Sequence, residues 1–193
     1  MVHSIVPLAV LEAVKNLDTP VEDGLTEFAE ELLVKRLGLS PTVAMQLAEY
    51  EQLVRRDGRV DGGHVEALLR LVGRRPDADL VFADAGRRAA RRAVHRIFPP
   101  LRLFGHFAAR RAAHAVLGAD LTRERHLPVA RVADPIAIHA TPDGAACGFY
   151  GAALAELLRL LVGYEGAMLH TACRATGAAA CEWRAAPPDP RHH

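Results

Sequence analysis

Apolar residues recur at helical spacing along the first part of the chain. Between residues 4 and 38 they fall every three or four positions, which predicts a helical segment. Ser40 and Pro41 then mark a break and a fresh helix N-cap. Short amphipathic helices are expected over 42–55 and 64–73, on either side of the turn-rich loop "RRDGRVDGG".

The pattern is helical again from 80 to 117, where Pro99 and Pro100 divide it into two helices. With Arg110 and Arg111 close by, one side of the first helix is able to bind a propionate or phosphate, although a solvated helix face is the simpler interpretation. That side carries Arg88, Arg91, Arg92 and His95.

The remaining third of the chain mixes strand and helix patterns. Residues 127–140 partly alternate and are rich in Val and Ile, which is typical of a strand. Residues 149–162 carry a broad apolar face and predict the clearest helix of the chain. Two short strands are expected over 167–171 and 180–185, joined by "CRATG".

This order of elements predicts an α+β protein with a small antiparallel sheet packed on helices. A helical N-terminal region is expected over 1–76, because Pro76 and its neighbouring aspartates mark the best internal boundary. The main domain is expected over 77–185. The tail, 186–193, contains "PPDPRHH" and is expected to be mobile.

Composition narrows the class of protein. The chain has 193 residues and a formal net charge of +1, so nothing drives the whole molecule toward nucleic acid. No recognition helix or interleaved aromatic pattern suggests nucleic-acid binding either. No apolar run is long enough to span a membrane, and the N-terminus lacks a signal-peptide pattern. We therefore expect a cytoplasmic protein whose cysteines are reduced.

All three cysteines lie within 35 residues, together with one histidine. Buried apolar thiols are one interpretation, and a reactive thiol is another, although no Cys-X-X-Cys pair is present. A structural zinc site is the third, because three thiolates and an imidazole form a common tetrahedral ligand set. The strand that contains His170 must break before Cys173 if both side chains are to reach one ion. The candidate ligands are Cys147, His170, Cys173 and Cys181.

The spacing Cys-x25-Cys-x7-Cys and the closing segment "TACRATGAAACEW" resemble the 4-vinyl reductase domain family, over residues 144–184. A weaker likeness to its bacteriochlorophyll-biosynthesis branch covers 78–140. In the aromatic-sensing branch three cysteines and an acidic residue bind zinc. The resemblance thus implies zinc at Cys147, Cys173 and Cys181, with His170 in place of the acid.

The resemblance also implies a ligand and a partner. In the pigment branch the ligand is a tetrapyrrole such as a bacteriochlorophyll precursor, and domains of this family often form homodimers. The expected role is that of a carrier or accessory in vinyl-group reduction. A vinyl reductase enzyme is an alternative, although no dinucleotide-binding motif is present, and a sensor of small aromatic compounds is another. The aromatic residues expected to line an apolar pocket are Phe104, Phe107, Phe149, Tyr150, Tyr164 and Trp183.

Overall fold

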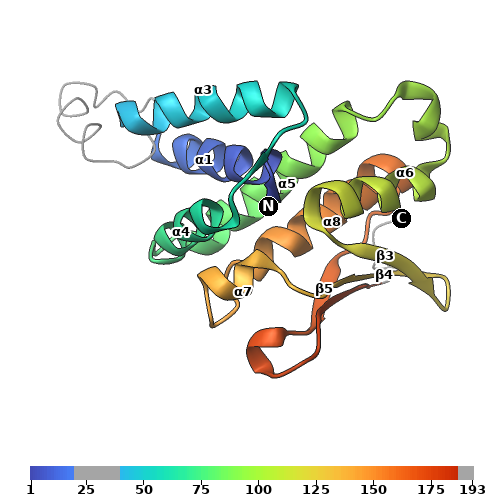
Figure 1. Cartoon of the computed structure of the whole chain (residues 1–193). Helices are drawn as coiled ribbons and strands as arrows, with labels where there is room; N and C mark the ends of the chain where they lie inside the picture. Colours follow the sequence, from blue (N-terminus) through green and yellow to red (C-terminus); the bar gives the residue numbers. More distant parts are fainter. Residues whose placement is uncertain (20–39, 187–193) are drawn as a thin grey trace, which may run out of the picture.

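The computed structural model describes residues 1–19 and 40–186 and confirms an α+β fold, in which helices and small antiparallel sheets combine (Figure 1). The second half of the segment expected to be helical between 4 and 38 lies outside these residues. So does the expected tail, apart from Ala186.

The N-terminal elements alternate short strands with helices. Strand β1 (Val2–His3) pairs antiparallel with β2 (Arg59–Val60), which ties the start of the chain to the loop after α3. Helices α1 (Ile5–Asp18), α3 (Pro41–Arg55) and α4 (Gly62–Gly73) match the amphipathic segments expected in this part.

The expected helix start at Ser40 is confirmed. Its side chain accepts a hydrogen bond from the backbone N–H of Val43 at 3.3 Å, and Pro41 occupies the first turn. Asp61 caps α4 in the same way. Polar side chains therefore fix where two of these helices begin.

Helix α5 (Ala78–His95) is the long central helix. Pro99 and Pro100 end the helical run as expected and open a single turn, η3 (Pro99–Leu103). The chain reverses there into α6 (Gly105–Ala112), which a π-helical turn, η4 (Ala113–Leu117), extends.

The main sheet has four antiparallel strands in the order β3-β4-β6-β5. Their bounds are β3 (Asp120–Glu124), β4 (Leu127–Val132), β5 (Met168–Ala172) and β6 (Cys181–Ala185). Along β6, Cys181, Trp183 and Ala185 are buried on the inner face, while Glu182 and Arg184 lie on the outer face.

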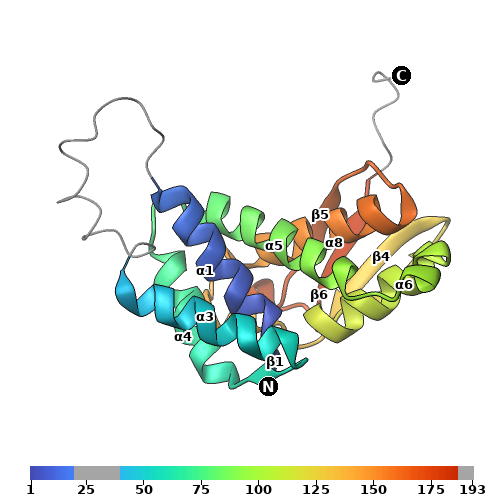
Figure 2. The ribbon, with the colours of Figure 1, turned by 90° about the horizontal axis from the view of Figure 1, so that it is seen from above.

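The inner face of the sheet packs on α8 (Cys147–Val162), which lies against α5, and α1 packs on the other side of α5. Figure 1 shows the sheet beneath α8, and Figure 2 shows α1, α5 and α8 side by side in that order. One hydrophobic cluster runs through these layers from Ile5 to Ala185. It contains residues from both sides of Pro76.

The expectation of strand over 127–140 is wrong in its second half. Strand β4 ends at Val132, and residues Ile136–Ala140 form the short helix α7. Pro135 has no N–H to continue a ladder, and it stands directly before the helix, where a proline is tolerated. Ala137 and Ala140 are then buried on one side of α7, which packs on α4.

Candidate metal centre

The hairpin β5–β6 supplies three of the four predicted ligands. His170 is in β5, Cys173 directly follows that strand, and Cys181 begins β6. The pairing of β5 with β6 shifts register between His170 and Ala172. This irregularity is the break that the strand parity of His170 and Cys173 requires, and it allows both side chains to reach one point.

The loop between the two strands is held by a single carbonyl. The oxygen of Cys173 accepts hydrogen bonds from the backbone N–H groups of Thr176 and Ala178, both at 3.1 Å. It also accepts one from the Thr176 hydroxyl at 2.9 Å. Gly177, with φ +91°, closes the turn in a conformation that favours glycine. The loop thus returns the chain so that Cys181 faces Cys173.

The fourth ligand, Cys147, is the first residue of α8, and a buried threonine positions it. The Thr141 hydroxyl donates to the carbonyl of Ala137 at 3.0 Å and accepts the N–H of Ala146 at 2.9 Å. These bonds join the end of α7 to the start of α8. Gly144, in the same turn, accepts the N–H of Cys147 at 2.9 Å.

Gly144 also lies directly against the sulfur atoms. It has φ +81°, and a Cβ atom built there would lie 3.4 Å from Cys173 Sγ and 3.9 Å from Cys147 Sγ. These are ordinary contact distances, so it is the backbone conformation that favours glycine at this position.

The four candidate ligands meet as predicted. One ligand atom from each of Cys147, His170, Cys173 and Cys181 lies within 4.8 Å of all the others. The sulfur atoms of Cys173 and Cys181 are 3.8 Å apart. Two thiolates at a tetrahedral zinc ion are also about 3.8 Å apart, since each Zn–S bond is about 2.3 Å. The cluster is close enough to bind a metal ion.

The surroundings keep the thiols of Cys147 and Cys181 protonated when no cation is present. Burial raises the pKa of Cys147, and the sulfur atoms of Cys181 and Cys173 raise it further. Burial also raises the pKa of Cys181, although the backbone N–H of Arg174, 3.4 Å from its sulfur, opposes the effect. Such thiols are poor nucleophiles, whereas a divalent cation would displace their protons.

His170 is oriented by an aromatic stack. Its ring lies parallel to that of Trp183 with the centroids 4.7 Å apart, and Tyr150 stacks on Trp183 at 5.5 Å. Partial burial of the ring lowers the pKa of His170, and the hydrogen bond with the backbone of Ala172 opposes this effect, so the imidazole is neutral at pH 7. A neutral imidazole is the form that binds metal ions.

The six aromatic residues expected to line a pocket lie in separate places. Phe149, Tyr150 and Trp183 are buried together beside the metal centre. The other three lie elsewhere: Tyr164 is beside the end of α8, and Phe104 and Phe107 are exposed near the start of α6.

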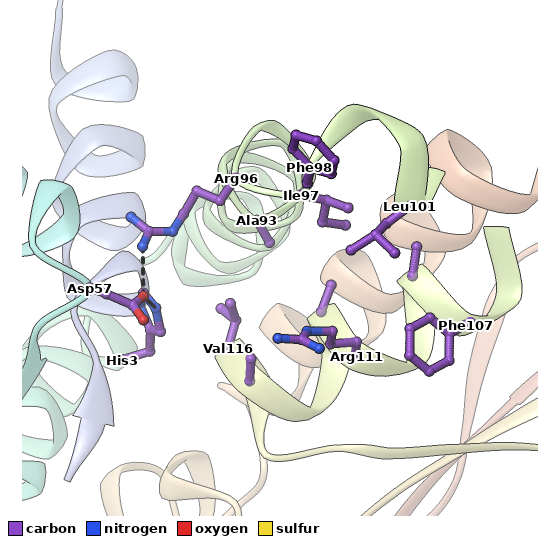
Figure 3. Close-up of a pocket in the computed structure, with 13 residues that line it drawn as sticks. His3, Asp57, Ala93, Arg96, Ile97, Phe98, Leu101, Phe107, Arg111 and Val116 are labelled. Atoms are coloured by element: carbon purple, nitrogen blue, oxygen red, sulfur yellow. Dashed lines mark hydrogen bonds and ion pairs between the residues drawn. The ribbon is translucent and has the colours of Figure 1, made fainter. Parts of the chain in front are cut away.

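The fold also forms a candidate ligand pocket beside α6. A cavity of about 310 Å³ lies between β1, α5, η3, α6 and η4 (Figure 3). His3, Asp57 and Arg96 close one end of it, since Asp57 accepts hydrogen bonds from Arg96 at 2.6 Å and pairs with His3 at 3.1 Å. Its remaining wall is largely apolar and includes Ile97, Phe98, Leu101, Phe107 and Val116.

Arg111 is the second cation of this cavity, and Figure 3 shows it between Val116 and Phe107. Among the residues that the structure describes, no carboxylate pairs with it. Arg111 was a candidate for anion binding from its sequence, but no sequence pattern indicated that it lies near a residue as distant as His3.

The arginine face of α5 is engaged within the fold. Arg91 and Arg159 both bond to Glu156, a buried residue of α8, and Arg92 pairs with Glu12 of α1. The hydrogen bonds from Arg159 lower the pKa of Glu156 most; burial opposes them, Arg91 adds to them, and the result is about 2. These arginines join neighbouring helices, so they are not available for a ligand.

Fold and site together define a class: an α+β protein with a candidate metal centre of three cysteines and one histidine. Comparisons with protein-family models, curated proteins and solved structures found no match for the chain. Over residues 1–19 and 40–186, no helix is long and apolar enough to cross a membrane.

Proposed function

We propose that the chain is a zinc-stabilised binding protein for a hydrophobic aromatic ligand with an acidic group. A tetrapyrrole such as a bacteriochlorophyll precursor is the first candidate, held or delivered as a substrate for vinyl-group reduction. The observation that carries the proposal is the cluster of Cys147, His170, Cys173 and Cys181, whose ligand atoms lie within 4.8 Å of one another.

Zinc is the metal that this ligand set favours. Three thiolates and one imidazole form a frequent structural zinc site, and soft sulfur ligands disfavour magnesium and calcium. Four protein ligands leave no open position for a substrate. The ion therefore has a structural role, in which it fastens the β5–β6 hairpin to the first turn of α8.

The cavity beside α6 supports a ligand with an apolar body and an anionic end. Its volume, about 310 Å³, falls at the lower end of the range typical of ligand pockets, and so it suits one edge of a macrocycle or a smaller aromatic molecule. Phe107 and Leu101 offer apolar contact, and Arg111 offers a guanidinium without a carboxylate partner in the described part of the chain. The tetrapyrrole itself is suggested by the sequence resemblance.

Metal analysis tests the first half of the proposal. The purified protein should contain one zinc ion per chain by elemental mass spectrometry, and Cys173→Ser should lower zinc content and thermal stability together. His170→Ala should weaken zinc binding, whereas His64→Ala, which removes an exposed histidine of α4, should not. A metal content well under one per chain in the unaltered protein would overturn the assignment.

Absorption titration tests the second half. A chlorin with a free propionate should give a saturable band shift, and Arg111→Ala should weaken binding about ten-fold through loss of a charge-assisted hydrogen bond. Arg110→Ala is the matched control, because Arg110 is also exposed on α6 but lines a different cavity. Absence of saturation contradicts the proposal, and turnover of the pigment with NADPH would favour the enzyme instead.

A further inference from the structure

The connection between α5 and α6 exposes an unusual amount of apolar surface. We refer to residues 96–111 as the α5–α6 corner. Four large apolar side chains within it are more than half exposed: Phe98 67%, Leu103 86%, Phe104 67% and Phe107 56%. In the rest of the described chain, exposed large apolar side chains come at most one from any helix or strand. Single ones need no explanation, but a cluster of four indicates an interaction surface.

The segment that contains the corner is strongly cationic, although the whole chain is nearly neutral. Residues 85–119 contain eight arginines and three histidines, and no aspartate or glutamate. Three arginines of α5, and Arg96 directly after it, find carboxylate partners on α5 itself or on other elements. Within the described residues, Arg102, Arg110 and Arg111 find none, and Arg123 contacts His106 instead.

Acidic residues close to these cations are already engaged. Asp57, which lines the cavity with Arg111, is bonded to Arg96 and His3. Glu124, which follows Arg123, is bonded to Arg131 and Arg184. The positive charge of the corner is therefore not cancelled locally, and it remains available to an anionic partner.

The corner projects from the body and is held firmly in place. Figure 1 shows the chain between α5 and α6 forming the upper right edge of the molecule. Pro99 and Pro100 fix the backbone of the turn. At Gly105 the start of α6 meets the end of α8 so closely that a Cβ atom would lie 2.0 Å from the Leu161 carbonyl oxygen. Leu103 and Phe104 therefore stand out from a rigid support.

We propose that the α5–α6 corner docks on the surface of an anionic lipid bilayer. Leu103 and Phe104 enter the interfacial region, while Arg102 and Arg110 of the corner meet the lipid phosphates together with Arg123 of β3, which contacts α6. Shallow apolar insertion and electrostatic attraction together give reversible binding to a membrane that no helix of the described chain spans. The inference does not depend on the ligand proposed above.

A second copy of this surface is a poorer partner. In a two-fold dimer the same patch meets itself, which would place the arginines of one chain against those of the other. Like charges across an interface oppose association, whereas anionic headgroups remove the repulsion. A projecting apolar turn also suits a fluid interface, which adapts to its shape.

Vesicle co-sedimentation of the full chain tests the proposal. The protein should bind phosphatidylcholine vesicles with about 30% phosphatidylglycerol and should not bind pure phosphatidylcholine. High salt should weaken binding, because the arginines are exposed. The charge reversal Arg110→Glu should lower the partition coefficient about 25-fold, since each charge unit near such a surface contributes about five-fold.

The apolar contribution has a matched control. Leu103→Ser/Phe104→Ser should lower partitioning at least ten-fold, since both side chains insert in the interface. Met45→Ser/Leu80→Ser removes two apolar side chains that are 67% and 63% exposed on other elements, and it should bind as the unaltered protein does. No binding by the unaltered protein, or equal binding by the two double variants, would overturn the proposal. So would a dimer in solution that only Leu103→Ser/Phe104→Ser dissociates.

Discussion

The residues of the candidate metal centre differ in whether they must lose a proton to bind a metal ion. Burial raises the pKa of Cys147 and Cys181, so these thiols are neutral until a cation arrives. Burial lowers the pKa of His170, so its imidazole needs to lose no proton at pH 7. The cost of deprotonation therefore falls on the thiols alone.

Zinc binding at pH 7 should consequently release the protons of Cys147 and Cys181, and none from His170. The bound form carries fewer protons than the free form, so the apparent affinity should rise with pH and fall on acidification. Calorimetric titration in buffers of different ionisation enthalpy measures the number of protons released. A value near zero would show that these thiols are ionised beforehand, and Cys181→Ser should reduce the value by about one.

The identity of the ligands was predictable from the sequence, but the residues that arrange them were not. Cysteine and histidine can be recognised as candidate metal ligands from residue type alone. Gly144 acts through its left-handed backbone, and Thr141 acts through its buried hydroxyl. Both properties depend on the fold around these residues. The segment "TPDG" before Cys147 indicates only a turn.

At the scale of elements, the contact between α5 and α8 holds the molecule together. Gly86 of α5 faces α8 so closely that a Cβ atom would lie 2.3 Å from the carbonyl oxygen of Phe149. Backbone atoms cannot give way as a side chain does. The alanines of α5 that are buried near it, Ala85, Ala89 and Ala90, keep the same face small.

Gly86→Ala should lower the free energy of unfolding by about 2 kcal/mol, because the two helices must separate to make room. Gly148→Ala in α8 is the control: nothing lies within 4 Å of a Cβ atom there, and alanine favours helix. It should be neutral or stabilising by up to about 1 kcal/mol. Denaturant unfolding with saturating zinc measures both, and equal stabilities would contradict this account of the packing.

Helices were predicted better than strands, for a physical reason. The apolar face of α8 and the Ser40 cap of α3 are visible in local sequence. Strand β3 was missed because Leu121 is its one apolar residue, and the turn into β4 uses Arg125 and His126 at positive φ. Such a turn usually contains Asn-Gly, so the signal for a hairpin was absent.

For the whole molecule, one hydrophobic cluster joins the N-terminal helices to the sheet, and it includes Cys147 and Cys181 of the candidate metal centre. The sequence did not show that α1 packs on α5, although 59 residues separate the end of one helix from the start of the other. Periodicity identifies which face of a helix is buried, but not against which partner. Removal of a bound metal ion should therefore loosen the β5–β6 hairpin, whose His170 lies outside the cluster, before it loosens the rest of the core.

Removal of zinc with a chelator should raise hydrogen exchange in β5, in β6 and in the first turn of α8, and leave α1 and α4 protected. The edge strand β5 pairs on one side only, so it depends most on the ion. Exchange measured by mass spectrometry at constant pH tests this, and adding zinc back should restore protection. A uniform rise over the whole chain would show that the centre and the core unfold as one unit.

The four candidate ligands are not equally accessible: Cys147 and Cys181 are buried, Cys173 is half-buried, and His170 is exposed at the sheet edge. An external chelator thus meets the imidazole before it meets any inner sulfur. Ligand replacement would begin at that nitrogen and end at the two interior thiolates. The exchange rate of a bound ion would then depend on one surface residue, whereas its affinity would depend on the two buried thiolates.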